Sequence, residues 1–231
     1  MSLSVRDAQV QELMDDPACD PDRLRATLQR FEVVNRLVSG WGAVYREHVR
    51  PLLSGLGRPA RVLDLGCGGG DVVTRLAALA RRDRLAATWL GVDPDARALE
   101  VARARSGADV AFAHGDSVSL LEAGERFDLV LSNHVLHHLD AEGLAAFTAE
   151  SRALSTGLVL HADIARSARA YGLYAVGITP FAPGTFLRTD GLRSIRRSYR
   201  PQELRQALPG WRIERPVPFR VLAVAEGTAG A

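Results

Sequence analysis

The stretch Arg61-Val-Leu-Asp-Leu-Gly-Cys-Gly-Gly-Gly-Asp71 decides the fold of this chain. In it an apolar run leads straight into four glycines, and a helical pattern follows over residues 71–82. Glycines at such a junction permit a sharp turn and a close approach of the backbone to a ligand, and the first turn of a helix presents free N–H groups. The stretch therefore predicts a strand, a turn and a helix that bind a nucleotide or a nucleoside.

The glycine spacing distinguishes between two cofactor classes. The dinucleotide fingerprint G-x-G-x-x-G would need Gly or Ala at position 71, where this chain has Asp71. A carboxylate there would face a pyrophosphate, so an NAD site is disfavoured. The stretch instead has the pattern D-x-G-x-G-x-G, with Asp64, Gly66, Gly68 and Gly70 at its fixed positions. Because Asp64 can accept from an amine, this pattern favours a ligand that carries an ammonium group and no phosphate.

Two more acids follow at the ends of later strand patterns. Asp93 lies 23 residues after Gly70, where a carboxylate can accept both hydroxyls of a ribose. Asp116 ends the next strand pattern and can accept an adenine amino group. The three acids together predict a nucleoside ligand.

Short β-rich runs alternate with helical runs through the body of the chain, which predicts βαβ units and a parallel sheet. At the C-terminus a short helix is followed by two strands with no helix between them, which predicts an antiparallel pair. We expect an α/β, Rossmann-like, doubly wound fold with a mainly parallel seven-stranded sheet and an antiparallel C-terminal strand. The predicted strands are residues 61–65, 87–92, 110–114, 127–132, 157–161, 211–218 and 219–226, and the predicted helices are 71–82, 96–105, 141–154 and 201–208.

Composition excludes several functions. All 29 basic residues are arginine, so a pyridoxal Schiff base, a lysine nucleophile and a Walker A loop are excluded. The net charge of +2 argues against a nucleic-acid partner. Cys19 and Cys67 lie in unrelated contexts, which indicates neither a disulfide framework nor a cysteine zinc site. No apolar run approaches the roughly 18 residues of a membrane span, and the polar, acidic start is not typical of a signal peptide. We therefore expect no stable membrane insertion and a cytoplasmic location.

The motifs LDLGCGGGD, GVDPDARAL, HGDS and FDLVLSNHVLHHL, in this order and spacing, resemble those of class I S-adenosylmethionine-dependent methyltransferases. The resemblance covers about residues 60–162. The segment Asn35-Arg-Leu-Val-Ser-Gly-Trp41 is also similar to one that precedes the glycine loop in ubiquinone/menaquinone-biosynthesis methyltransferases. Helical spacing in residues 1–58, with a helix start at Asp20-Pro21, predicts a helical N-terminal cap. We expect a methyltransferase domain over residues 59–231, in which residues 162–200 form a lid before the last helix.

The resemblance also implies S-adenosylmethionine as the cofactor and assigns the residues that bind it. Asp64 and the glycines would line its methionine end, Asp93 would hold the ribose, and Asp116 would flank the adenine. The remaining expected cofactor contacts are Cys67, Pro94, Ser117 and Asn133.

Histidines follow the fourth and fifth predicted strands, at the edge where open α/β sheets bind ligands. His134 and His138 lie just beyond residues 127–132, and His161 ends residues 157–161. A histidine with an ordinary pKa near 6.5 suits the deprotonation of a phenol or an enol, so these three are the candidate bases. His134, His137 and His138 have helical spacing, but without a further ligand they do not predict a metal site.

Residues 162–200 supply the candidate acceptor contacts. Tyr171 and Tyr174 share one face of a predicted helix, which indicates a partly hydrophobic acceptor. Arg193 and Arg197, together with Arg196 and Arg200, follow in a segment with an excess of positive charge, which favours an acidic acceptor.

The sequence predicts methyl transfer to a small molecule, with O-methylation of a phenolic, quinone-like or polyketide-like acceptor in biosynthesis as the first interpretation. Asn133 begins no Asn-Pro-Pro-Tyr motif, which argues against a nucleobase acceptor. C-methylation of a similar acceptor, or a non-catalytic methyltransferase-like binding subunit, stays open as an alternative. The sequence leaves the oligomeric state undetermined.

Overall fold

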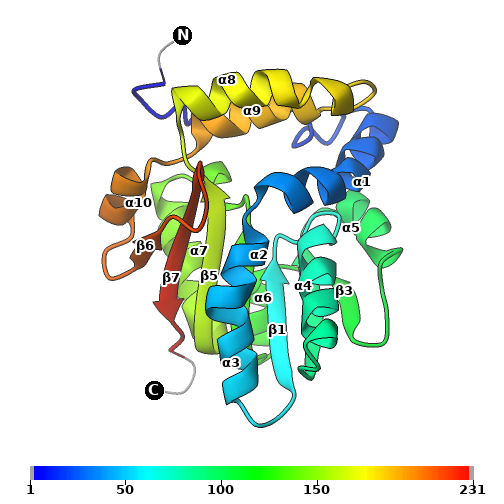
Figure 1. The fold of residues 1–231 in the computed structure, drawn as a ribbon, viewed down its shortest axis with the longest axis vertical. Helices are drawn as coiled ribbons and strands as arrows, with labels where there is room; N and C mark the ends of the chain where they lie inside the picture. Colours follow the sequence, from blue (N-terminus) through cyan, green and yellow to red (C-terminus); the bar gives the residue numbers. More distant parts are fainter. Residues whose placement is uncertain (1–2, 229–231) are drawn as a thin grey trace.

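A computed structural model describes residues 3–228 of the chain. Seven strands form one sheet, and helices cover both of its faces (Figure 1). In chain order the elements of the described residues are α1 (Pro21–Val38), α2 (Trp41–Val44), the π-helical turn η1 (Tyr45–Val49), α3 (Arg50–Gly55), β1 (Ala60–Leu65), α4 (Asp71–Arg82), β2 (Ala87–Asp93), α5 (Ala96–Arg103), β3 (Val110–His114), α6 (Ser117–Glu122), β4 (Phe127–Asn133), the 3-10 turn η2 (Leu136–His138), α7 (Ala141–Leu154), β5 (Ser155–Ile164), α8 (Ala168–Gly177), the 3-10 turn η3 (Thr179–Phe181), α9 (Leu187–Arg197), α10 (Pro201–Ala207), β6 (Arg212–Glu214) and β7 (Arg220–Glu226).

The strand order is β3-β2-β1-β4-β5-β7-β6. Strands β1 to β5 are parallel to one another, and β7 runs antiparallel to both β5 and β6. This order confirms the predicted doubly wound, mainly parallel seven-stranded sheet with an antiparallel C-terminal strand. The order reverses between β1 and β4, which is where ligands bind in open α/β sheets. Among the described helices, none has the length and apolar character needed to cross a membrane.

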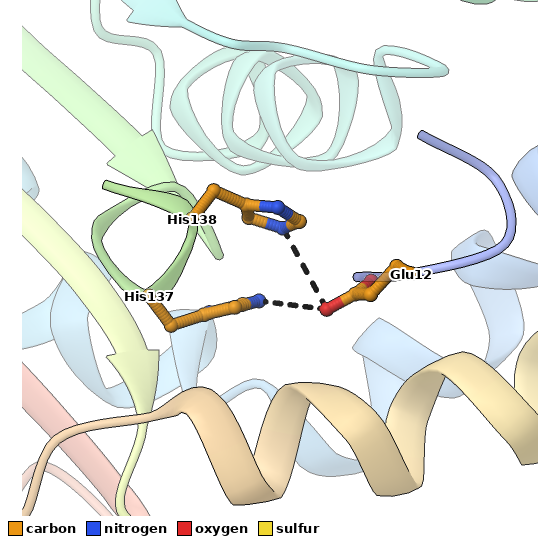
Figure 2. Close-up of side chains that lie close together, drawn as sticks. All are labelled: Glu12, His137 and His138. Carbon is orange, nitrogen blue, oxygen red and sulfur yellow. Dashed lines mark hydrogen bonds and ion pairs between the residues drawn. The ribbon is translucent and has the colours of Figure 1, made fainter. Parts of the chain in front are cut away.

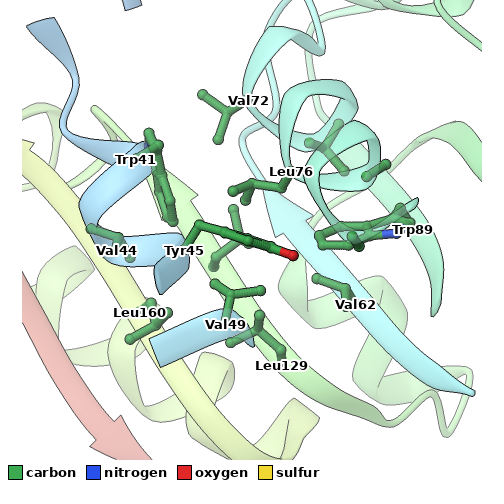
Figure 3. Packing of buried hydrophobic residues seen from close by; sticks show 14 of the residues in the cluster. Trp41, Val44, Tyr45, Val49, Val62, Val72, Leu76, Trp89, Leu129 and Leu160 are labelled. Atoms are coloured by element: carbon green, nitrogen blue, oxygen red, sulfur yellow. The ribbon is translucent and has the colours of Figure 1, made fainter. Parts of the chain in front are cut away.

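One face of the sheet is covered by the continuous helical segment α2-η1-α3 together with α4. Trp41, Tyr45 and Val49 are buried against Val62 of β1 and Leu129 of β4 (Figure 3). These N-terminal side chains belong to the same buried cluster as the sheet, so residues before position 58 share its core. The division of the chain at residues 58 and 59 stays a prediction.

The opposite face packs mainly against α6 and α7. Leu63 and Val130 of the sheet meet Leu154 of α7 in a second buried cluster, with Leu120 of α6 at its border. The strands therefore bury side chains on both faces of the sheet, which is typical of a parallel sheet covered by helices on either side.

Helices α8 and α9 lie across the carboxyl ends of the strands, as Figure 1 shows, and they occupy most of residues 162–200. Helix α1 begins at Pro21, as predicted, and Asp20 caps it by accepting from the amides of Asp22 and Arg23. It contacts α4 and α5 near the glycine loop. Three helices therefore form a roof over the edge of the sheet at which the candidate ligand residues lie.

The two C-terminal strands are shorter than predicted, with β6 confined to Arg212–Glu214 and β7 beginning at Arg220. Pro216 and Pro218 lie between them, and proline has no N–H to donate to a strand ladder. Helix α5 ends two residues earlier than predicted, and α10 one residue earlier.

Gly70 provides a test of the strand-turn-helix junction. Its φ is +75°, and a Cβ atom there would lie 2.6 Å from the ring of Phe112. We expect Gly70→Ala to lower the free energy of unfolding by about 2–4 kcal/mol, because a left-handed alanine and an overpacked ring both cost energy. Urea unfolding measures the change. Gly55→Ala is the control, since its Cβ would meet nothing within 4 Å. If Gly70→Ala is as stable as this control, the tight junction is not required.

Candidate functional site

A cavity of about 1010 Å³ opens between the carboxyl ends of the strands and the helical roof. It extends from the glycine loop after β1, past the end of β4, to α8, α9 and the start of β7. This volume is at the upper end of the range for small-molecule sites, roughly 300–1,000 Å³. The cavity can therefore hold a nucleoside-sized ligand and a second molecule beside it.

Asp64 is a buried carboxylate that borders the cavity at its glycine-loop end. It is 1% exposed, and neither of its oxygens has a hydrogen-bond partner among the described residues. Burial, and then the charges of Asp71 and Asp93, raise the pKa of Asp64 well above its ordinary value. A cation placed against Asp64 would satisfy these oxygens and lower that pKa. The structure thus fits an ammonium-bearing ligand at this position.

The glycines keep this end of the cavity open. Gly66 and Gly68 have φ values of +70° and +53°, which L-residues rarely adopt. A Cβ atom on Gly66 would also lie 2.7 Å from the side chain of Val135. Both glycines line the cavity, as do the expected cofactor residues Cys67, Pro94 and Asn133.

Asp93 ties the glycine loop to the end of β2. Its Oδ2 accepts from the amide of Gly68 and its Oδ1 accepts from the amide of Asp95, each at 2.8 Å. The side chain lines the cavity, and each oxygen has a further lone pair. The carboxylate can therefore accept ribose hydroxyls while it holds the loop.

Two side-chain contacts at this end were not predicted from the sequence. Asn35 of α1 donates to Asp71 Oδ2 at 3.0 Å, so Asp71 lines the cavity in addition to starting α4. Trp41 donates through Nε1 to Asn133 Oδ1 at 3.0 Å, which fixes the amide at the end of β4. Both contacts join the N-terminal helices to the predicted motifs, and local sequence patterns do not report such long-range pairs.

Three expected cofactor residues do not line the cavity. Gly70 faces Phe112 instead. Asp116 accepts from the amide of Ser119 as the N-cap of α6, and Ser117 donates to Glu150 at 2.5 Å. The assignment of Asp116 and Ser117 to adenine stays a prediction.

His137 contacts Glu12 of the N-terminal segment (Figure 2) and Asp163 at the end of β5, and so joins the two. Its Nδ1 lies 2.7 Å from Asp163 Oδ1, and its Nε2 lies 3.2 Å from Glu12 Oε1. Burial lowers the pKa of His137, but the carboxylates of Asp163 and Glu12 outweigh it and raise the pKa to about 9. The imidazole is therefore charged at neutral pH and clamps residues around Glu12 over the cavity.

His138 lies beside this clamp and lines the cavity with its side chain partly exposed. Its Nδ1 lies 3.2 Å from Asp15 Oδ2, and its Nε2 faces Glu12 Oε1 at 3.8 Å, as Figure 2 shows for Glu12. Nδ1 also lies 3.4 Å from Arg197 Nη1, so this nitrogen faces both a carboxylate and a guanidinium. Glu12, His137 and His138 are also close enough to share an ion. Glu12 Oε1 already accepts from Ser194 at 2.6 Å, and the prediction of no bound metal stays untested.

His134 has a less suitable environment for a base. It has a φ of +63°, and its Nε2 accepts from the Arg220 guanidinium. Burial, and then the charge of Arg220, lower its pKa well below the ordinary value. His134 lines the cavity but holds a proton poorly.

His161 does not reach the cavity, which corrects its assignment as a candidate base. Its ring is fully buried between Phe147 and Trp211, and its Nδ1 lies 2.8 Å from Ser132 Oγ. Burial lowers its pKa to about 3. The period-2 alternation of β5 turns this side chain to the opposite face of the sheet from the site.

The predicted acceptor contacts are also revised. Tyr174 lines the cavity, but Tyr171 does not. Arg193 donates to the carbonyl of Gln11, and Arg197 donates to the carbonyl of His138 and pairs with Asp15 at 3.5 Å. The other two arginines of the predicted cluster bind the N-terminal segment as well, Arg196 at Asp7 and Arg200 at the carbonyl of Leu3. None of the four lines the cavity, and their side chains contact the N-terminal segment and His138 instead.

Comparisons with known proteins agree with this geometry. Residues 62–157 match the family described as a methyltransferase domain. The ubiquinone biosynthesis O-methyltransferase of Brucella anthropi is 34% identical over 154 residues, which are 64% of this chain and 57% of that protein. The protein of the same name from Brucella ovis is 33% identical over 153 residues, with the same coverage. The chain thus spans less than two thirds of these relatives.

Solved structures share the fold. The CurJ carbon methyltransferase aligns over 90% of this chain and 61% of its own, with a TM-score of 0.63 and 17% identity. The magnesium protoporphyrin IX methyltransferase (ChlM) of Synechocystis PCC 6803, with bound SAH, aligns over 87% of this chain and 97% of its own, with a TM-score of 0.51 and 18% identity.

These matches agree with three features of the chain. They are the ordered motifs, the reversal of strand order between β1 and β4, and the unpartnered acid beside the glycine loop. Residues 62–157 thus match a methyltransferase domain, and the fold around them is the one found in class I S-adenosylmethionine-dependent methyltransferases.

Proposed function

We propose that this protein transfers the methyl group of S-adenosylmethionine to an oxygen of a phenolic, quinone-like or polyketide-like small molecule, in secondary metabolism. One observation carries the proposal: a single cavity has the glycine loop, Asp64 and Asp93 at one end, and His138 farther along the same edge of the sheet. The cofactor site and a candidate base thus border the same space.

The residues at the glycine-loop end would hold the cofactor. Asp64 would face its ammonium group, Gly66 and Gly68 would admit its methionine part, and Asp93 would accept from its ribose. S-adenosylmethionine supplies a strongly electrophilic methyl group when it is bound, so the protein mainly aligns the reactants and excludes water.

His138 would remove the proton from the acceptor hydroxyl. Its side chain lines the cavity, and the carboxylates of Asp15 at Nδ1 and Glu12 near Nε2 would stabilise the imidazolium that forms. His137 is already protonated, since its pKa is raised to about 9, and His134 accepts from Arg220. His138 is therefore the preferred base among these three histidines.

C-methylation of a similar acceptor is the second candidate, because it also begins with a deprotonated oxygen. The first relatives are named as O-methyltransferases and one structural neighbour as a carbon methyltransferase, so the names do not exclude it. A non-catalytic subunit is disfavoured by the intact glycine loop and Asp93. Helices α8 and α9, with the N-terminal segment, would form the lid that shields the acceptor.

Asp93 tests the cofactor assignment. We expect Asp93→Ala to weaken S-adenosylmethionine binding by about tenfold to several hundredfold, because charge-assisted hydrogen bonds are worth about 1.5–3 kcal/mol each. Titration calorimetry measures the affinity. Asp109→Ala is the control, since Asp109 pairs with Arg81 just before β3, at the amino edge of the sheet. Equal affinity in Asp93→Ala and the parent protein would falsify the ribose assignment.

His138 tests the acid-base assignment and, with it, the proposed activity. Transfer of labelled methyl groups to a panel of catechols and naphthols would be measured for the parent, His138→Gln and His161→Gln. We expect His138→Gln to lower turnover by about 100- to 10,000-fold with unchanged cofactor affinity. His161→Gln should keep its turnover, because its ring lies outside the cavity. An unreactive parent protein that still binds the cofactor would favour the non-catalytic alternative.

The His137 clamp predicts how stability depends on pH. Its pKa is raised from the 6.5 of an unfolded chain to about 9, so its stabilising effect is complete below pH 6.5 and is lost as the pH rises through about 9. Urea unfolding between pH 6 and pH 10 should therefore show a decline in stability. His137→Gln should show a flatter profile over this interval. Parallel profiles for the two proteins would show that His137 is not the titrating group.

A further inference from the structure

Arg220 is a buried cation in the wall of the cavity. It is 7% exposed, its Nε donates to the carbonyl of Val38 at 2.8 Å, and its Nη1 donates to His134 Nε2. Among residues 3–228, no carboxylate forms an ion pair with it. Its Nη2 has no hydrogen-bond partner in this part of the chain, so these N–H groups are free to meet a ligand.

The acid with the largest electrostatic effect on Arg220 is Asp163, and its oxygens are already occupied. Asp163 Oδ2 accepts from the amide of His137 at 2.9 Å, and Oδ1 accepts from the amide of Ile164 and pairs with the His137 imidazole. Burial lowers the pKa of Arg220 to about 10, so the guanidinium stays charged at neutral pH. Buried charges are costly unless they are paired, and this charge lacks a partner within the described chain.

Arg220 lies in the half of the cavity away from the cofactor residues. It pairs with Ile164 at the end of the β5–β7 ladder, whereas the glycine loop follows β1. In the sheet, β7 is the third strand from β1, after β4 and β5. At the usual spacing of about 4.8 Å between neighbouring strands, the axes of β1 and β7 are roughly 14 Å apart. Arg75 lines the cavity beside α1, nearer the cofactor end, where it donates to the carbonyl of Asn35 at 3.3 Å. A cofactor carboxylate would therefore have a cationic partner, Arg75, at its own end of the cavity.

Apolar side chains line this half of the cavity together with the carboxylates of Glu12 and Asp190, which already accept hydrogen bonds from Ser194, Leu13 and Met14. Val217, Ile178 and Leu187 line this half of the cavity, and the hydroxyl of Tyr174 already donates to the carbonyl of Leu187 at 2.8 Å. An apolar pocket with one unpaired guanidinium fits a hydrophobic molecule that carries one anionic oxygen group.

We propose that Arg220 binds a carboxylate of the methyl acceptor, and that the acceptor is a hydrophobic, aromatic acid. This inference rests on the proposed function in one respect: the half of the cavity near α8 and β7 receives the acceptor. The arginines predicted from the sequence for this task, Arg193 and Arg197, are held by the N-terminal segment, and Arg220 takes their place.

The test compares three ligands that share a hydroxynaphthalene ring and carry an anionic group, a neutral ester or no substituent at one position. Calorimetry on protein saturated with S-adenosylhomocysteine would measure binding of 6-hydroxy-2-naphthoic acid, its methyl ester and 2-naphthol. We expect the parent protein to bind the acid roughly 10- to 100-fold more tightly than the other two. Arg220→Met should abolish this preference, and Arg220→Lys should keep part of it. Arg212→Met, at an exposed arginine on the adjacent β6 strand, is the matched control and should keep all of it.

Several outcomes would overturn the inference. Equal affinities for the three ligands in the parent protein would do so without any variant, even if Arg220→Met fails to fold. A preference for the acid that persists in Arg220→Met would also overturn it. If Arg220→Met instead loses affinity for S-adenosylhomocysteine and keeps the acid preference, Arg220 binds the cofactor.

The binding measurement is independent of methyl transfer. Preferential binding of the acid in a protein that methylates no acceptor would leave this inference standing and remove the proposed activity. Methyl transfer to neutral naphthols, with no preference for binding the acid, would support the proposed activity and overturn this inference.

Discussion

The reversal of strand order between β1 and β4 is the constraint on which the rest of the structure depends. Helices that follow these two strands leave on opposite faces of the sheet, so a crevice opens above their carboxyl ends. The glycine loop after β1 and Asn133 at the end of β4 border this crevice from either side. A bound ligand there meets free amide groups at the start of α4, and the three roof helices complete the enclosure.

Buried groups without a charged partner lie at both ends of the enclosed space. The end near β1 and β2 has the carboxylates of Asp64, Asp71 and Asp93, whose pKa values are all raised, chiefly by burial. The end near β7 has the Arg220 guanidinium, whose pKa burial lowers. Other charged side chains also line the cavity, among them Arg75 near the glycine loop and Asp190 of α9. The unpartnered oxygens of Asp64 and the unpartnered Nη2 of Arg220 nevertheless suit a cationic group at one end and an anionic group at the other.

The N-terminal segment accounts for most of the polar contacts that close the roof. Glu12 reaches His137 and Ser194, and the backbone amides of Leu13 and Met14 donate to Asp190 of α9 at 2.8 and 3.0 Å. Arg193, Arg196 and Arg197 of α9 bind the same segment at Gln11, Asp7 and Asp15. These contacts give the three arginines a structural role in place of the acceptor recognition predicted from their charge.

The sequence by itself determined the sheet, its order of elements and the cofactor end of the site. Those features depend on local signals: hydrophobic periodicity for the strands and helices, glycines at a strand-helix turn, and acids near the ends of the first three strands. The tertiary structure alone decided which histidines border the cavity and that the arginine in its wall, Arg220, has no carboxylate partner. His138 lies after β4 and lines the cavity, whereas His161 lies within β5 and does not. Glu12, Asp15 and Arg220 come from segments without a motif. Pairing across 100 or more residues is set by packing, and no local pattern in the sequence records it.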